Sequence, residues 1–183
     1  MSSVAETVAA LRVGALVLLP TDTVYGLCAD PSVDGAARRL AELKGRDPSQ
    51  PVALLFADLE TALRRFPAAA RAHRLFPGPF TVVVTDAERG SVGIRIPVLP
   101  REPAAIVRQA GAVLATSANL HGGPDPRRLE DVPDEIRSAC AAELDGGELP
   151  GVPSTVVDLT GDEPRVLREG AVPAAEALAQ LRR

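Results

Sequence analysis

The sequence predicts an α/β fold built on a mixed β-sheet. Short aliphatic runs alternate with segments whose apolar residues recur at helical spacing, which indicates strands alternating with helices. Two pairs of neighbouring strands read as hairpins, so the sheet should be mixed rather than purely parallel. The chain of 183 residues is 46% hydrophobic and 3% aromatic, which favours one domain with a core of Val, Leu, Ile and Ala.

The N-terminal half should hold four helices and two strands. Ser2 or Ser3 would cap the first helix and Gly14 would end it. The run "ALVLLP" has the pattern of a short buried strand that proline ends. A second helical pattern has Asp34 near its N-cap and ends at Gly45. The expected elements are helix 3–13, strand 15–20, helix 34–46, strand 51–58 and short helices 58–65 and 68–75.

The C-terminal half should hold two hairpins, one further strand and three helices. The runs "FTVVVTD" and "VGIRIP" flank a turn at Gly90 and read as the first hairpin. "PSTVVDLT" and "PRVLREG" read as the second. The expected elements are strands 80–86 and 92–97, helix 100–111, strand 112–119, helix 131–140, strands 153–160 and 164–170, and helix 173–183.

Several classes of protein are excluded or disfavoured by simple features. Cys28 and Cys140 form no metal-binding pattern, which indicates two reduced thiols. The N-terminus lacks the order of a signal peptide, and no apolar run reaches the roughly 18 residues of a membrane span, so we expect a cytoplasmic protein. The net charge of −4 argues against a broad nucleic-acid surface. The sequence has neither a GxxxxGK[ST] nor a GxGxxG motif.

Lys44 is the only lysine among 20 basic residues. Arginine bias can follow genome composition, and Lys44 could then be a leftover surface residue. A lysine kept where arginine is otherwise used also indicates a place that needs a compact ammonium rather than a planar guanidinium. On that interpretation, we expect Lys44→Ala to remove most activity with little loss of stability.

Polar residues occur at strand ends, where the loops of α/β proteins meet at one crevice. Taken singly, they could make turns, cap helices or pair with surface charges. Together with Lys44 and Arg46 they suit the binding of small anions and a nucleotide, and they contain no catalytic triad. These residues are Thr21, Asp22, Thr23, Tyr25, Arg95, Thr116, Ser117, Asn119, Ser154, Thr155 and Arg168.

Seven motifs in order resemble the YrdC-like threonylcarbamoyl-AMP synthases. They are "PTDTVYGL", "LKGRDPSQP", "FPGPFTVVV", "GIRIP", "TSANLHG", "PSTVVDLT" and "VLREG", and they span about residues 15–170. The resemblance implies one YrdC-like domain over residues 1–183, with a twisted mixed sheet, flanking helices and a basic concave cleft. It also implies the synthesis of threonylcarbamoyl-AMP and pyrophosphate from L-threonine, bicarbonate and ATP. This reaction is the first step of N6-threonylcarbamoyladenosine formation in tRNA.

The resemblance implies a role for each matching residue. Threonine would be held by Thr23, Arg95, Ser154 and the backbone at Ala115. ATP would be held by Lys44, Arg46, Gln50, Ser117, Asn119, Asp125 and Arg168. Lys44 and Arg46 would also be the catalytic pair, since positioning and charge stabilisation dominate such chemistry. Mg²⁺ is expected only through the ATP phosphates, with no metal site of the protein's own.

The chain departs from the family pattern at five positions. Gln50 stands where Asn is usual, and Leu55 stands where many relatives have a histidine near threonine. His121 and Asp125 each replace a serine, and Cys28 replaces a glycine. The role implied for Asp125 therefore depends on a side chain that differs from that of its relatives.

Two other functions stay open at this point. One is a YrdC-like module of hydrogenase maturation, although the zinc-finger and acylphosphatase segments that accompany such modules are lacking in this sequence. The other is a non-enzymatic RNA-binding or ribosome-associated protein, against which the acidic balance argues. For the synthase, the expected partners are the small substrates and downstream tRNA threonylcarbamoyl transferase proteins, with weak or no direct tRNA binding.

Overall fold

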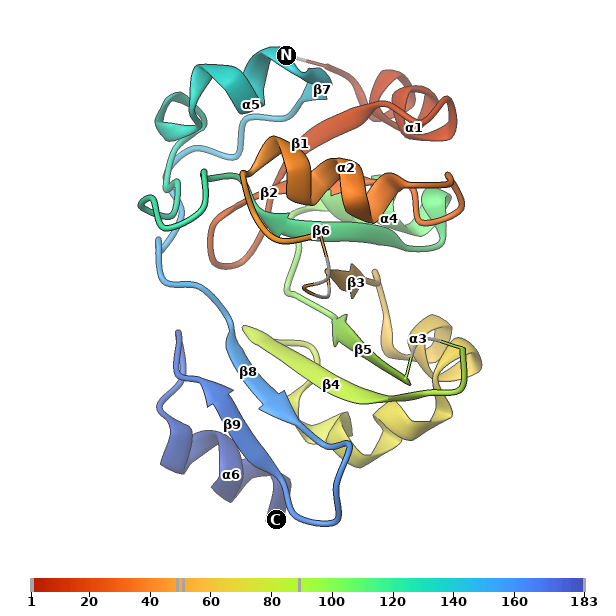
Figure 1. The fold of residues 1–183 in the computed structure, drawn as a ribbon, viewed down its shortest axis with the longest axis vertical. Coiled ribbons are helices and arrows are strands. Elements are labelled where there is room, and N and C mark those ends of the chain that lie inside the picture. The colour runs from red at the N-terminus through yellow and green to blue at the C-terminus, as the bar shows by residue number, and fades with distance from the viewer. Residues whose placement is uncertain (1, 49, 51, 89, 183) are drawn as a thin grey trace.

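A twisted mixed β-sheet runs through the molecule, with helices outside it (Figure 1). The computed structural model describes residues 2–48, 50, 52–88 and 90–182. Within these ranges the sheet has nine strands in the order β7-β1-β2-β6-β3-β5-β4-β8-β9. The strands are β1 (Leu16–Pro20), β2 (Tyr25–Ala29), β3 (Ala53–Leu55), β4 (Phe80–Asp86), β5 (Gly90–Arg95), β6 (Val113–Ser117), β7 (Cys140–Glu143), β8 (Thr155–Asp158) and β9 (Arg165–Arg168). The predicted α/β class is confirmed.

Helices cover each half of the sheet separately. In Figure 1, α1, α2 and α4 lie beside β1, β2 and β6, while η1 and α6 lie beside β4, β8 and β9. None of the helices in the described ranges is long and apolar enough to cross a membrane. The helices are α1 (Val4–Arg12), α2 (Ala36–Leu43), α3 (Leu59–Arg65), η1 (Pro67–Leu75), α4 (Arg101–Ala110), η2 (Leu129–Asp131), α5 (Asp134–Ser138) and α6 (Ala174–Arg182), of which η1 and η2 are 3-10 helices.

Both predicted hairpins are confirmed, and parallel pairs connect them into the sheet. β4 pairs antiparallel with β5, and β8 pairs antiparallel with β9. The pairs β1–β7, β3–β5 and β4–β8 are parallel. The sheet is therefore mixed, as the adjacent strand pairs predict.

The strand β2 was not predicted, because its motif read as a loop. The side chain of Thr21 makes the turn: its hydroxyl donates to the carbonyl of Val24 at 2.7 Å and accepts from the amides of Thr23 and Val24. A hydroxyl that replaces backbone partners lets the chain reverse within four residues. Tyr25 then pairs with Pro20, and β1 and β2 form a third hairpin.

The other differences concern the ends of elements. The predicted helix 131–140 is the short α5 followed by an edge strand, β7, whose four residues give too little pattern to read. Helix α2 starts after Gly35, which has a positive φ of 75°, rather than at Asp34. Strand 51–58 is found only as β3, and its predicted first residue lies outside the described residues. The same holds for residue 183 of the predicted last helix.

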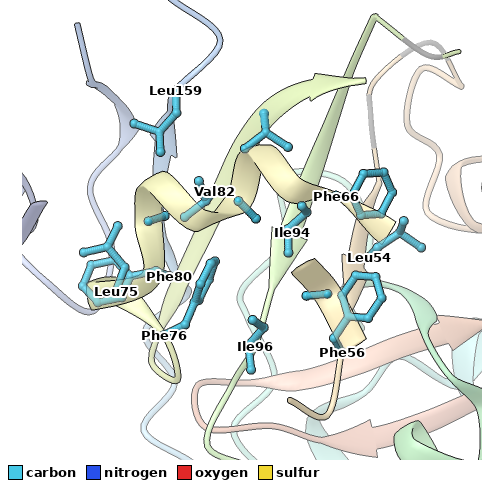
Figure 2. Packing of buried hydrophobic residues seen from close by; sticks show 14 of the residues in the cluster. Leu54, Phe56, Phe66, Leu75, Phe76, Phe80, Val82, Ile94, Ile96 and Leu159 are labelled. Atoms are coloured by element: carbon cyan, nitrogen blue, oxygen red, sulfur yellow. The ribbon is translucent and has the colours of Figure 1, made fainter. Parts of the chain in front are cut away.

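The hydrophobic core is divided into three clusters, and the aromatic residues are concentrated in one of them. All four phenylalanines of the chain, Phe56, Phe66, Phe76 and Phe80, are buried in the cluster that η1, β4 and β5 share (Figure 2). The rings of Phe56 and Phe66 meet edge to face with centroids 6.2 Å apart. The other two clusters are almost wholly aliphatic, so the expected aliphatic core is confirmed for the N-terminal half of the sheet.

A connecting segment, residues 144–154, leads from β7 in one half of the molecule to β8 in the other (Figure 1). The buried Tyr25 anchors it, because the phenol bonds Asp145 Oδ1 at 3.0 Å and the Gly147 carbonyl at 2.9 Å. The phenol oxygen also accepts from the amide of Gly146 at 2.9 Å. The amide of Gly151 further along donates to the carbonyl of Thr23 at 2.8 Å. The motif "PTDTVYGL" thus holds the connecting segment in place.

The buried position of Tyr25 predicts that its phenol ionises only at high pH. Burial raises the pKa of Tyr25 to about 12, so the folded state favours the protonated phenol. The stabilisation is fully present below the unfolded pKa of about 10 and is lost as the pH rises towards 12. The chain has one tyrosine and no tryptophan, so phenolate absorbance reports this group alone. If the phenolate of Tyr25 formed at nearly the same pH in the folded chain as in the urea-unfolded chain, Tyr25 would not be the buried anchor of the connecting segment.

Candidate functional site

A cavity of about 250 Å³ lies over one face of the sheet. Residues without large side chains form its floor, and these are Gly26, Ala53, Gly93 and Ala115. Its charged lining residues are all cations, namely Arg46, Arg95 and Arg168. The described residues that line it include no carboxylate, cysteine or histidine. The cavity is therefore electropositive within a chain of net negative charge.

Arg95 lies in the cavity because side chains alternate along β5. Its neighbours Ile94 and Ile96 are 0% and 2% exposed and belong to the core, so Arg95 faces the opposite side. This confirms the orientation that the sequence predicts.

The turn before β2 holds the guanidinium of Arg95. Its Nη2 pairs with Asp22 Oδ1 at 2.5 Å and donates to the hydroxyls of Thr21 and Thr23. The other oxygen of Asp22 accepts from the amide of Val98 at 3.1 Å. The Nε–H of Arg95 is buried and has no partner among the described residues. A buried donor without a partner is costly, so the guanidinium of Arg95 has unused hydrogen-bonding capacity for an anionic ligand.

The predicted threonine-binding residues do not all reach the cavity. Ala115 lies on the floor, and Ser154 is 4% exposed on the wall. The hydroxyl of Ser154 bonds the hydroxyl of Thr81 at 2.8 Å, and its carbonyl accepts from Arg168 Nη2 at 2.8 Å. Thr23 is completely buried beneath Arg95 and does not line the cavity. In this structure it supports Arg95.

Lys44 caps the C-terminus of α2 and lies behind the cavity wall. Its ammonium donates to the carbonyls of Ser117 and Asn119 and to Asn119 Oδ1, the last at 2.8 Å. The residue is 4% exposed. Burial and the neighbouring Arg46 lower the pKa of Lys44 to about 8, against an opposing effect of Asp125, so the amine stays protonated at neutral pH.

The ammonium of Lys44 therefore holds the loop after β6 in shape. A direct contact with phosphate stays a prediction, and it would require Lys44 to give up one of these acceptors. Removing the ammonium would leave buried carbonyl groups unpaired. The expectation that Lys44→Ala costs little stability is thus inconsistent with the position of this side chain.

The predicted ATP-binding residues fall into two groups. Arg46, Ser117 and Arg168 line the cavity, and burial lowers the pKa of both arginines. Asn119 is buried behind Ser117, and its Oδ1 accepts from the Ser117 hydroxyl at 2.6 Å.

Gln50 and Asp125 do not line the cavity. The side chain of Gln50 is exposed beside a separate groove next to α2, and the backbone carbonyl of Gln50 accepts from Arg46 Nη2 at 3.1 Å. Asp125 is half-buried, and its charge opposes the lowering that burial causes in the pKa of Lys44 and of Arg168. Their contact with a nucleotide stays a prediction.

Sequence reasoning missed Thr81 and three small residues of the floor, namely Gly26, Ala53 and Gly93. Thr81 lines the cavity through the alternation of "FTVVVTD", in which Phe80 and Val82 face the core. The alternation along this strand places Thr81 on the face opposite the core, and this pattern could have predicted that Thr81 lines the site. Gly93 and Ala53 have no polar side chain, so nothing in the sequence marks them as residues of a binding site.

The cavity suits anion binding rather than covalent catalysis. Cys28 and Cys140 are free thiols, and burial raises the pKa of each to about 12, so neither is an activated nucleophile. Arginines and hydroxyls are the groups that bind carboxylates and phosphates. The fold and the site together define an α/β protein with a cavity suited to small anions over one face of a mixed sheet.

A sequence model of the Sua5/YciO/YrdC family, described as "Telomere recombination", matches residues 9–170, so the chain belongs to this family. Threonylcarbamoyl-AMP synthase of Pyrococcus abyssi is 34% identical over 91% of the chain. The enzyme of that name from Chromohalobacter salexigens is 36% identical over 87% of the chain and 94% of its own length. The crystal structure of P. abyssi Sua5 complexed with L-threonine superimposes with a TM-score of 0.86 at 31% identity, covering 97% of this chain and 56% of that one.

The chain spans about half the length of the P. abyssi relative, namely 53%. The common region is the one that contains the cavity, since the family match covers every residue that lines it.

Proposed function

We propose that the chain makes threonylcarbamoyl-AMP and pyrophosphate from L-threonine, bicarbonate and ATP. The observation that carries this proposal is the guanidinium of Arg95, which lines an electropositive cavity of about 250 Å³ and has a buried Nε–H without a partner among the described residues. Curated relatives named threonylcarbamoyl-AMP synthase and a related structure with bound L-threonine support the same activity.

Threonine would bind with its carboxylate at Arg95. Asp22 and Thr23 bond only Nη2 of that guanidinium, and the buried Nε–H has no partner among the described residues. The amine would lie against the backbone at Ala115, and the hydroxyl of Ser154 is on the adjoining wall. The ligand would thus exchange its hydration for fixed, directed hydrogen bonds.

The reaction needs positioning more than covalent participation of the protein. The amine of threonine and bicarbonate combine to a carbamate with loss of water. A carbamate oxygen then attacks the α-phosphorus of ATP, and the bond from that phosphorus to pyrophosphate breaks. Arg46 and Arg168 would stabilise the charge that develops on the phosphates. Ser117 would orient the nucleotide, while Lys44 and Asn119 support its loop from behind.

Mg²⁺ would enter on the phosphates of ATP as part of the substrate complex. The mixed anhydride made in this way is an activated acyl donor, so we expect a second protein to transfer the threonylcarbamoyl group to an adenosine of tRNA. We expect this work to take place in the cytoplasm. Gln50 and Asp125, which lie outside the cavity wall, would contact ATP only at its periphery.

The experiment that tests the proposal is pyrophosphate release by the purified chain with each substrate omitted in turn. Release should need threonine, bicarbonate and ATP together. A YrdC-like RNA-binding protein would bind RNA but release no pyrophosphate. A module of hydrogenase maturation would act without threonine. Release that is independent of threonine would overturn the proposal.

The cavity should prefer threonine to serine and serine to valine. Serine lacks one methyl group, which is worth about 1–3 kcal/mol in a close-fitting pocket. Valine lacks the hydroxyl, so it would give up the hydrogen bond that the threonine hydroxyl would make with the polar wall at Ser154, at a greater cost. Pyrophosphate release with each amino acid at fixed ATP and bicarbonate measures this order. Faster turnover of valine than of serine would mean that the pocket recognises shape alone.

A further inference from the structure

Two glycines lie inside strands without an evident structural reason. Other glycines of the chain are needed for a positive φ, such as Gly14, or for close packing, such as Gly146 against Pro20. Gly26 in β2 and Gly93 in β5 have neither a positive φ nor a forbidding contact. Glycine weakens a strand, so its presence there often marks a place where a ligand approaches the backbone.

Both strand glycines line the cavity, and the protein itself has space for a methyl group at each. A Cβ on Gly93 would meet Ala53 Cβ and Thr81 Cγ2, each at 3.4 Å. A Cβ on Gly26 would meet no atom closer than 3.6 Å. Since these are ordinary contact distances, the space that is kept free at these two positions belongs to the cavity.

Gly93 belongs to a row of small residues that crosses the floor. Ala115 of β6 is the register partner of Ala53 of β3, and Ala53 is the neighbour of Gly93 of β5. On the far side Gly93 pairs with Val83 of β4, which also lines the cavity. Arg95 lies two residues further along β5 on the same face.

We propose that Gly93 determines which amino acid the cavity accepts, because its bare backbone makes room for the β-methyl group of threonine. This inference rests on the proposed function. An amino acid whose carboxylate is at Arg95 and whose amine is at Ala115 has only its side chain left to lie over Ala53 and Gly93. A methyl group on Gly93 would fill the space of the ligand's own methyl, so serine would fit where threonine no longer does.

The test compares the wild type with Gly93→Ala by pyrophosphate release over a range of threonine and of serine. The threonine KM should rise about tenfold or more, as for one misplaced methyl group, and the serine KM should change less. The preference for threonine over serine should therefore shrink. Gly161→Ala, at an exposed glycine with no atom near its Cβ, is the matched control and should leave both KM values unchanged.

The failure of this inference can be told apart from the failure of the proposed function. A wild type without threonine-dependent release overturns the function and this inference with it. An active wild type whose threonine-to-serine preference is unchanged in Gly93→Ala overturns the inference alone. Should that variant unfold, Thr81→Ser is added, since it removes the Cγ2 that the new Cβ meets and keeps the hydroxyl that bonds Ser154. The same change in preference is expected in the double variant.

Discussion

Replacing Arg95 with alanine should raise the threonine KM by tens- to thousands-fold, because a charged, hydrogen-bonded contact of this kind is worth about 2–5 kcal/mol. Arg95 is the cavity cation whose Nη2 pairs with Asp22 and whose buried Nε–H has no partner among the described residues. The ATP KM should change much less, because Arg46 and Arg168 still line the cavity. Pyrophosphate release measured against each substrate separates the two effects.

A matched control removes an arginine–aspartate pair elsewhere on the same sheet. Arg165 of β9 pairs with Asp158 at 2.9 Å and does not line the cavity. Arg165→Ala should therefore leave both KM values as they are. If Arg95→Ala instead weakens ATP binding and leaves the threonine KM unaltered, Arg95 serves ATP rather than threonine.

Replacing Lys44 with methionine should lower stability and activity together. The variant leaves the buried carbonyls of Ser117 and Asn119 without their ammonium donor, which should cost about 2–4 kcal/mol of unfolding free energy. The loop that carries Ser117 would then shift against the nucleotide, and small displacements of this kind cost on the order of a hundredfold in rate. Urea denaturation and pyrophosphate release measure the two quantities.

Two companion variants make the role of Lys44 specific. Lys44→Arg should restore activity only in part, since a planar guanidinium does not reproduce a compact ammonium among three acceptors. Arg38→Ala on the same helix removes an exposed cation and should change little. Wild-type stability with lost activity in Lys44→Met would mean that the ammonium serves the ligand directly and that the loop does not depend on it.

The sequence predicts those parts of the fold that local patterns encode. The alternation of apolar residues placed β4, β5, β8 and β9 in two hairpins, and it placed Arg95 on the face opposite Ile94 and Ile96. Strand β2 was missed because the side chain of Thr21 makes a turn that looks like a functional loop. Strand β7 was missed because a four-residue edge strand is recognised only by its pairing with β1.

The sequence predicted the charged residues that line the candidate site, but it did not predict the shape of the cavity. Motif matching brought Arg46, Ser117, Ser154 and Arg168 to one cavity. That Lys44 lies behind this cavity depends on packing between α2 and the loop after β6, which no local pattern reports. The floor of small residues is equally hidden, because Ala and Gly become informative only when the register aligns them across strands.

The measurement that tests the central claim most directly is the fate of the bicarbonate carbon. The purified chain is incubated with ATP, threonine and isotope-labelled bicarbonate, and the nucleotide product is analysed by mass spectrometry. We expect a threonylcarbamoyl-AMP that carries the label, is formed in step with pyrophosphate and is strongly reduced in Arg95→Ala. Consumption of ATP without any labelled product would contradict the proposed synthesis. So would a nucleotide product that lacks the label.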